Sequence, residues 1–163
     1  MLIILSGLPG VGKTTIAREL ARRLEAVHIR IDSIEHALSG LGRPLDDRGY
    51  RVGYAVAFDN LRLGRRVIAD SVNPLPTTRA SWRAVAQRAE TPARDVEIRC
   101  SDPLEHRRRV EARTPDIAGM RLPTWTEVVS RDYRPWDRDR IVVDTSRMDV
   151  DDSIEAILAA IET

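Results

Sequence analysis

A glycine-rich segment close to the start of the sequence leaves few folds open to this chain. It reads Gly7-Leu-Pro-Gly-Val-Gly-Lys-Thr14 and matches the pattern G-x-x-x-x-G-K-[ST], whose backbone N–H groups surround a phosphate. The apolar run Leu2–Ser6 precedes the segment and predicts a buried strand, and Ile16, Leu20 and Leu24 follow it at helical spacing. The sequence therefore predicts a strand, a phosphate-binding loop and a helix, in that order.

Each position of this motif has a physical role. Glycine accepts the positive φ angles that a loop wrapped around an anion requires. Lys13 would reach the β- and γ-phosphates, and the Thr14 hydroxyl would face Mg²⁺ as a metal ligand. The alternative is an ordinary glycine-rich turn between a strand and a helix. The expected nucleotide-binding residues of the loop are Gly7, Gly10, Val11, Gly12, Lys13, Thr14 and Thr15.

The charge composition singles out the lysine of this motif. The chain has 26 Lys and Arg against 25 Asp and Glu, a net charge of +1, and Lys13 is its only lysine. The codon usage of a GC-rich genome explains a general preference for arginine, but a single retained lysine indicates a chemical need for a compact point charge. The nearly balanced charge also argues against a protein that grips nucleic acid through a broad basic face.

Length and composition predict one globular domain over 1–163. The single cysteine, Cys100, excludes an internal disulfide and a cysteine-based zinc site. No apolar run approaches the roughly 18 residues of a membrane span. We therefore expect a cytoplasmic protein without a membrane partner, either a monomer or a homodimer.

Short apolar runs alternate with amphipathic stretches along the whole chain. The expected strands are Leu2–Ser6, 27–31, 66–70, 96–100 and 141–143. The expected helices are Lys13–Leu24, 33–38, 48–63, 77–89, a helix from Pro103, 124–133 and 151–161. This alternation is typical of an α/β fold with a parallel sheet between two layers of helices, in which ligands bind at the carboxyl ends of the strands.

With its phosphate loop and this order of elements, the sequence resembles the small P-loop kinases of the adenylate-kinase-like superfamily. The most similar groups are the zeta toxins, chloramphenicol phosphotransferases, gluconate kinases and polynucleotide kinases. The resemblance implies a three-layer P-loop NTPase fold with a five-stranded parallel sheet in the kinase-type order 2-3-1-4-5. It also implies ATP and Mg²⁺ as cofactors and a small lid segment, expected at about 107–123.

Asp32 is the expected catalytic base. We expect it at the end of the strand 27–31, where a carboxylate can take the proton of an acceptor hydroxyl and orient its oxygen, and the resemblance implies the same role. The alternative is an N-cap for a helix that begins at Ser33. Polynucleotide kinases place an arginine three residues after this aspartate, whereas this chain has Glu35, which argues against a nucleic-acid end as substrate.

The segment after the third expected strand supplies further substrate residues. The segment Val67–Asn73 resembles the strand-end segment of the same kinases, and this resemblance implies that Asp70 holds a Mg²⁺-bound water or touches the acceptor and that Asn73 orients the acceptor. Arg79 is expected to face the same cleft. The alternative is a turn fixed by Asx hydrogen bonds. The mixed-charge stretch 40–51 is a further expected acceptor-recognition segment because it follows Asp32.

Arg109 and Arg113 lie four residues apart and share one helix face. The resemblance implies that Arg109 contacts the adenine side of the nucleotide and that Arg113 is a catalytic arginine aimed at the transferring phosphate. The alternative is a solvated face with a Glu105–Arg109 pair. In the loop after the fifth strand, Arg147 is an expected nucleotide-binding residue.

These features predict an ATP-dependent kinase that phosphorylates a hydroxyl of a small molecule. Two alternatives remain open at this stage. One is an RNA or DNA end kinase on the same fold, and the other is a nucleotide-dependent switch or ATPase without a small-molecule acceptor.

Overall fold

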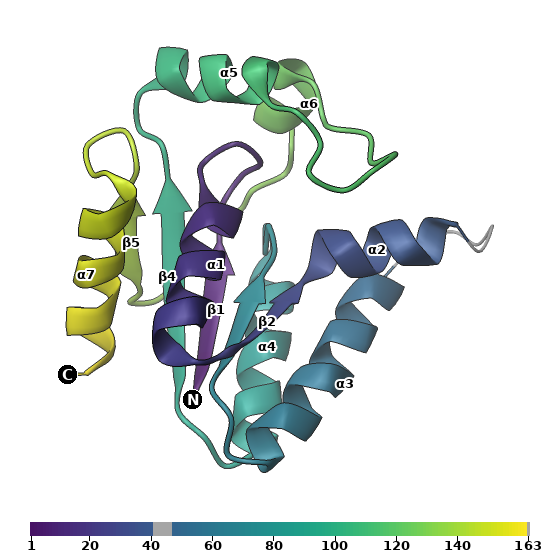
Figure 1. Cartoon of the computed structure of the whole chain (residues 1–163), viewed down its shortest axis with the longest axis vertical. Coiled ribbons are helices and arrows are strands. Elements are labelled where there is room, and N and C mark those ends of the chain that lie inside the picture. Colours follow the sequence, from purple (N-terminus) through teal and green to yellow (C-terminus); the bar gives the residue numbers. More distant parts are fainter. Residues whose placement is uncertain (41–46, 163) are drawn as a thin grey trace.

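A five-stranded parallel sheet forms the centre of the computed structural model, which describes residues 1–40 and 47–162 (Figure 1). Its strands are β1 (Leu2–Ser6), β2 (Val27–Arg30), β3 (Val67–Asp70), β4 (Ala93–Arg99) and β5 (Ile141–Asp144). Their order across the sheet is β2-β3-β1-β4-β5, and every pairing is parallel. The predicted α/β class and sheet order are therefore confirmed.

Helices cover both faces of the sheet. They are α1 (Lys13–Leu24), α2 (Ile31–Ser39), α3 (Arg48–Arg62), α4 (Pro76–Arg88), α5 (Pro103–Ala112), α6 (Trp125–Val129) and α7 (Val150–Ile161). The helices α1 and α7 pack together on one face, and α3 and α4 pack together on the other. Among these described helices, none is long and apolar enough to cross a membrane.

The central strand β1 is fully buried and supplies side chains to two separate cores. Ile3 and Leu5 join the core beneath α1 and α7, whereas Leu2 and Ile4 join the core beneath α3 and α4. This split follows from the alternation of side chains along a strand, and it explains the continuous apolar run in the sequence.

The helices α2 and α3 pack closely through two glycines of α3. A Cβ atom at Gly53 would lie 2.6 Å from Cδ1 of Ile31, and one at Gly49 would lie 2.3 Å from Cγ of Glu35. Glycine normally weakens a helix, but here the absence of a Cβ atom lets the two helices touch. The expected helix at 48–63 is therefore present.

Three elements differ from the sequence-based expectations by two residues or more at one end. The helix α2 begins at Ile31 instead of Ser33, β4 begins at Ala93 instead of Val96, and α6 ends at Val129 instead of Tyr133. Figure 1 shows α5, α6 and the loop between them above the carboxyl ends of the strands. This cap covers the end of the sheet at which ligands bind in parallel α/β folds.

Candidate active site

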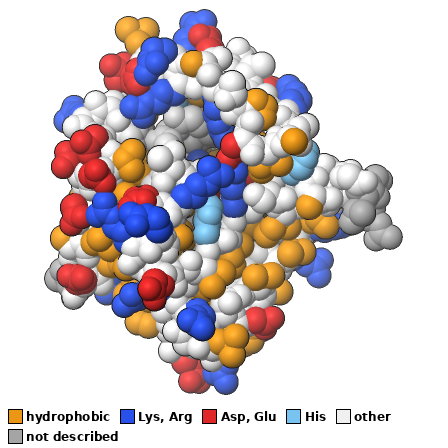
Figure 2. Space-filling model, viewed as in Figure 1, with side chains coloured by type: hydrophobic (Ala, Val, Ile, Leu, Met, Phe, Trp, Pro, Cys, Tyr) orange, Lys and Arg blue, Asp and Glu red, His pale blue; other side chains and the backbone are white. Residues whose placement is uncertain are grey.

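A cleft of about 1010 Å³ lies between the cap and the sheet. In Figure 2 a hollow is visible below the cap, with Lys and Arg side chains along its rim. The lining comes from the phosphate loop, α2, the start of α3, the cap and the loop after β5. The polar lining residues include Lys13, Thr14, Thr15, Asp32, Glu35, His36, Tyr50, Arg109, Arg113, Arg121, Arg131 and Thr145.

The glycine-rich loop has the geometry that the motif predicts. Gly7, Gly10 and Gly12 have φ angles of 144°, 86° and 98°, so the expected positive φ values are confirmed. A Cβ atom at Gly7 would lie 2.1 Å from the backbone oxygen of Ile98, so this position also requires glycine for space. The loop ends at Gly12, the N-cap of α1, where free backbone N–H groups favour an anion.

Lys13 is buried at the floor of the cleft, with 8% of its surface exposed. Its Nζ donates a hydrogen bond to the backbone oxygen of Leu8 at 3.0 Å. Burial lowers the pKa of Lys13 to about 8; Asp70 and Asp32 oppose this decrease, and Arg113 and Arg131 add to it. A bound phosphate would therefore stabilise the charged form of Lys13, because it supplies a negative charge next to the buried ammonium group.

The Thr14 hydroxyl and the Asp70 carboxylate lie together beside this lysine. Burial alone would raise the pKa of Asp70, but hydrogen bonds from His28 and Thr14 and the charge of Lys13 keep it below its ordinary value. Nε2 of His28 lies 3.2 Å from Oδ2 of Asp70, a contact that the sequence did not suggest. A hydroxyl and a carboxylate suit Mg²⁺, which prefers oxygen ligands and takes others from phosphates and water.

Asp32 lies at the cleft but not at the end of a strand. The strand β2 stops at Arg30, and Asp32 stands in the first turn of α2. The N-cap position of α2 is Arg30, whose side chain makes no capping hydrogen bond. The alternative interpretation of Asp32 as the N-cap residue is therefore wrong. The carboxylate of Asp32 is 39% exposed and lies 3.8 Å from the Arg30 guanidinium. Its charge also acts on Lys13, which places it near the phosphate end of the cleft.

Asn73 is part of the protein interior instead of the cleft lining. Its side chain is fully buried, and Nδ2 donates a hydrogen bond to the backbone oxygen of Leu5 at 3.0 Å. The backbone N–H of Asn73 donates to the hydroxyl of Tyr50 at 3.4 Å. Its φ of 46° is one that asparagine tolerates. Asn73 therefore holds the loop after β3. Its side chain does not line the cleft, which argues against the predicted contact with the acceptor.

Arg79 is likewise buried, at 1% exposure, and it does not line the cleft. The guanidinium donates hydrogen bonds to backbone oxygens of Asn73, Pro74, Arg134 and Pro135. It also stacks on Trp136 at 4.1 Å from the ring centroid. The prediction that Arg79 faces the cleft is therefore wrong, because this planar group with five donors instead ties two loops together.

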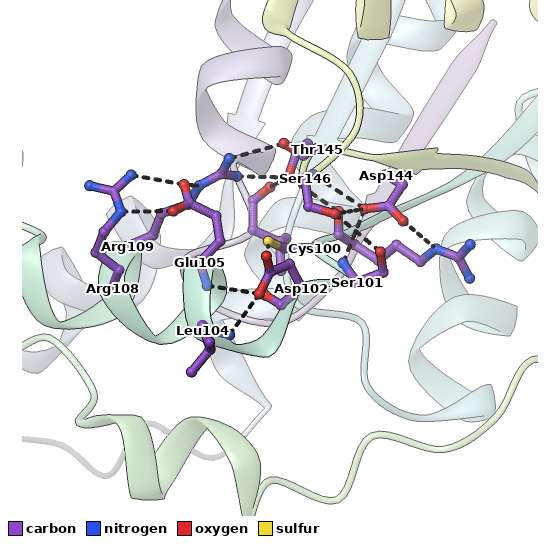
Figure 3. Close-up of polar contacts among 12 residues, drawn as sticks. Cys100, Ser101, Asp102, Leu104, Glu105, Arg108, Arg109, Asp144, Thr145 and Ser146 are labelled. Atoms are coloured by element: carbon purple, nitrogen blue, oxygen red, sulfur yellow. Dashed lines mark hydrogen bonds and ion pairs between the residues drawn. The ribbon is translucent and has the colours of Figure 1, made fainter.

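Arg109 joins the cap to the phosphate loop. Figure 3 shows its guanidinium between Glu105 and Thr145. Nη1 and Nη2 donate to the hydroxyl and the backbone oxygen of Thr145 at 2.8 and 2.9 Å, and that hydroxyl donates to the backbone oxygen of Val11. Arg109 therefore lines the nucleotide end of the cleft and also forms the Glu105 ion pair that was the alternative interpretation.

The other two predicted arginines lie in different environments. Arg113 follows α5, lines the cleft and lies near enough to Lys13 to lower its pKa. Arg147 has a side chain that is 79% exposed and does not line the cleft, so its contact with the nucleotide stays a prediction. In the same loop, Asp144 accepts hydrogen bonds from Ser101 and Ser146 and fixes the backbone (Figure 3).

Several residues that line or border the cleft were not predicted from the sequence. Arg131 lines the cleft and acts electrostatically on both Lys13 and Glu35, but it is one of many arginines and stands outside any motif. Asp116 of the cap pairs with Arg30 at 2.7 Å, and no pattern in the neighbouring sequence predicts this contact.

The sequence could have indicated Glu35 and His36, because they follow Asp32 by three and four residues and so share its helix face. Of the stretch 40–51, residues 41–46 lie outside the described residues, and Tyr50 lines the cleft.

The sheet order, the phosphate loop and the capped cleft define a P-loop protein of the kinase type. A family model described as an AAA domain (AAA_33) matches residues 2–124, so the chain belongs to this family. No curated protein matches the chain significantly in sequence.

Solved structures of P-loop kinases share the fold over nearly the whole chain. APS kinase of Mycobacterium tuberculosis in complex with AMPPNP and APS superposes with a TM-score of 0.72 at 22% identity, covering 99% of this chain and 97% of that chain. A Janibacter sugar kinase gives a TM-score of 0.68 at 19% identity, covering 99% and 94%. A gluconokinase from Sinorhizobium meliloti gives 0.67 at 17% identity, covering 98% and 90%. The predicted fold resemblance to small P-loop kinases is confirmed.

Proposed function

We propose that this protein is an ATP- and Mg²⁺-dependent kinase that transfers the γ-phosphoryl group to a hydroxyl of a small-molecule acceptor. One observation carries the proposal: Lys13 of the phosphate loop and Asp32 of α2 open onto the same cleft. A phosphate clamp beside a solvent-accessible carboxylate is the arrangement that phosphoryl transfer to a bound hydroxyl requires.

Asp32 is the proposed general base. Its carboxylate accepts the proton of the acceptor hydroxyl while that oxygen bonds to the γ-phosphorus, the β–γ bridging bond breaks, and ADP leaves. Lys13 and the backbone N–H groups of the loop hold the phosphates, and Arg113 and Arg131 lie near Lys13. Their positive charges would stabilise the negative charge that develops on the transferring group.

The Thr14 hydroxyl and the Asp70 carboxylate are the proposed protein side of a Mg²⁺ site. No group of three or more His, Cys, Asp or Glu side chains in the described part of the chain is arranged to hold a metal. A cation at Thr14 and Asp70 would therefore need the phosphates of the nucleotide as further ligands. When bound, Mg²⁺ would neutralise charge on the β- and γ-phosphates.

The proposed acceptor is a small molecule. The neighbours with the same fold include a gluconokinase, a sugar kinase and an APS kinase, each named for a small-molecule substrate. The cleft is enclosed by the cap, and Glu35 occupies the place of the arginine expected in polynucleotide kinases. A domain with a net charge of +1 also lacks the excess of positive charge that supports general nucleic-acid binding.

The test is release of ADP from ATP and Mg²⁺ across a panel of sugars, polyols, nucleosides, antibiotics and RNA ends, with Asp32→Asn alongside the wild-type protein. We expect acceptor-dependent turnover that falls roughly 10²- to 10⁴-fold in Asp32→Asn, since a positioned base contributes about that much. ATP binding should not change. Equal turnover in the variant would contradict the base assignment. Slow hydrolysis independent of every acceptor would instead favour a switch.

A further inference from the structure

One face of α2 presents a polar stripe to the cleft. Its members follow helical spacing and all line the cleft: Asp32, Glu35, His36 and Ser39. Ile31, which also lines the cleft, and Ile34 pack against the core beneath α3. A helix face that packs against the protein core is usually apolar, whereas these four side chains that line the cleft are polar. The stripe therefore has the composition expected of a surface that contacts a polar ligand.

Glu35 has an unusual environment on this stripe. Its side chain is partly buried, and this burial, with a smaller contribution from Asp32, raises the pKa of Glu35. A Cβ atom at Gly49 would lie 2.3 Å from Cγ and 3.0 Å from Oε1 of Glu35. Figure 1 shows α2 crossing the upper end of α3. Glycine at position 49 therefore makes the room in which Glu35 sits.

The carboxylate of Glu35 is available to a ligand. No described residue donates a hydrogen bond to it, although it lies within the electrostatic reach of Asp32 and Arg131. Its oxygen atoms are not among the buried side-chain atoms that lack a partner, so water solvates the carboxylate in the free protein and a hydrogen-bond donor of a ligand can replace that water. Arg131 lines the same cleft and also acts on Lys13, so its positive charge reaches both Lys13 and Glu35.

We propose that Glu35 determines acceptor specificity by accepting a hydrogen bond from a second hydroxyl of a neutral polyhydroxylated acceptor, while Asp32 holds the hydroxyl that is phosphorylated. This inference rests on the proposed kinase function. Residues three apart on a helix have Cβ atoms roughly 5–6 Å apart, a spacing that two hydroxyls of one small molecule can match. An acceptor that carried its own negative charge there would meet two carboxylates.

The first test uses defined probes in both binding and turnover. The probes are D-glucitol and myo-inositol as neutral polyols, D-gluconate as the anionic counterpart of glucitol, and a 5′-hydroxyl oligoribonucleotide. Binding is followed in the presence of AMPPNP by tryptophan fluorescence or calorimetry, and turnover by ADP release. We expect a neutral polyol to be preferred over gluconate and over the oligoribonucleotide.

The variant Glu35→Ala should then raise the acceptor KM about tenfold or more with kcat within about twofold, because a charge-assisted hydrogen bond is lost. The ATP KM should not change. Removing the contacted hydroxyl from the acceptor should weaken wild-type binding by a similar factor, and Glu35→Ala should add nothing further for that deoxy analogue. Ser33→Ala, on the exposed side of the same helix, is the matched control and should leave acceptor KM unchanged.

A second measurement tests the position of Glu35 without any acceptor. Gly49→Ala places a Cβ atom against Glu35 and should lower the melting temperature. The double variant Gly49→Ala/Glu35→Ala removes the atoms that clash and should recover most of that loss. If the double variant is no more stable than Gly49→Ala alone, the contact between Gly49 and Glu35 does not hold Glu35 in place.

Three results would overturn the specificity role of Glu35. They are an unchanged acceptor KM in Glu35→Ala, an equal effect of this variant on the parent acceptor and every deoxy analogue, and a preference for gluconate or the oligoribonucleotide. Failure of the proposed function looks different: neutral polyols would bind with AMPPNP, and Glu35→Ala would weaken that binding, but no probe would stimulate ADP release.

Discussion

The nucleotide end and the acceptor end of the cleft are built in different ways. The nucleotide end comes mainly from one contiguous loop and the start of α1, and its geometry follows from the positions of three glycines. The acceptor end combines α2, Tyr50 of α3 and Arg131 after α6, which are distant in sequence. The first depends on local backbone preferences, and the second depends on tertiary contacts. Substitutions that disturb long-range packing should therefore affect the acceptor end while sparing the loop.

The largest expected effect belongs to the nucleotide end. Lys13→Met should lower kcat about 10²- to 10³-fold, because a preorganised charge on the β- and γ-phosphates is lost. The unfolding free energy should stay the same or increase, since this burial of a charged ammonium is unfavourable in the absence of nucleotide. Lys13→Arg is the control that keeps the positive charge. It should not restore activity, because the planar guanidinium group has a different shape from the compact ammonium group. Near wild-type turnover in Lys13→Arg would contradict the point-charge role.

The next effect concerns the acceptor end. Arg79→Ala should lower the unfolding free energy by roughly 2–4 kcal/mol, because several buried backbone oxygens lose their donor. At temperatures where the variant is folded, the acceptor KM should rise more than the ATP KM, since Arg79 ties the 134–135 segment to the loop after β3. Urea unfolding and steady-state kinetics measure both. Arg79→Lys should fail to rescue stability, and Thr77→Ala, exposed on the same helix, should have little effect.

A pH experiment sharpens the role of Lys13. Its pKa in the free protein is about 8, and a bound phosphate should raise it. ATP binding above pH 8 should therefore take up a proton, and ATP affinity should fall by up to about tenfold per pH unit. The unfolding free energy without ligand should change in the opposite direction. Below pH 8 the charged Lys13 is fully destabilising, and between about pH 8 and 10.5 the folded protein loses this charge, so the unfolding free energy should increase. Calorimetry in two buffers of different ionisation enthalpy measures the uptake, and Lys13→Met should abolish it.

The smallest expected effect tests how the cap is held over the cleft. Asp116 pairs with Arg18 at 2.6 Å and with Arg30 at 2.7 Å, and these hydrogen bonds hold its pKa well below the usual range. Asp116→Asn should lower global stability by no more than about 1 kcal/mol, because the pair is partly exposed. Amide hydrogen exchange over 114–121 should nevertheless become faster. Asp132→Asn, which breaks an exposed pair with Arg134, is the matched control and should leave that segment unchanged.

The sequence by itself determined the nucleotide end and the sheet. The motif at Gly7–Thr14, the single lysine and the alternation of apolar runs were sufficient to predict the loop geometry and the parallel fold. These signals are local or periodic, because glycine conformation and side-chain alternation act over a few residues. The cap arginines Arg109 and Arg113 were also predicted to lie at the cleft, and they do.

Only the tertiary structure decided which polar residues line the proposed acceptor end of the cleft. Asn73 and Arg79 follow β3, as predicted, but their side chains point into the protein interior. There they donate hydrogen bonds to backbone oxygens that would otherwise be buried without a donor. Arg131 reaches the cleft because the 131–136 segment folds back on Pro74, a contact between residues far apart in the chain. In a chain with many arginines, composition cannot separate a structural arginine from one that meets a ligand. That choice depends on which partners the fold brings within hydrogen-bonding distance.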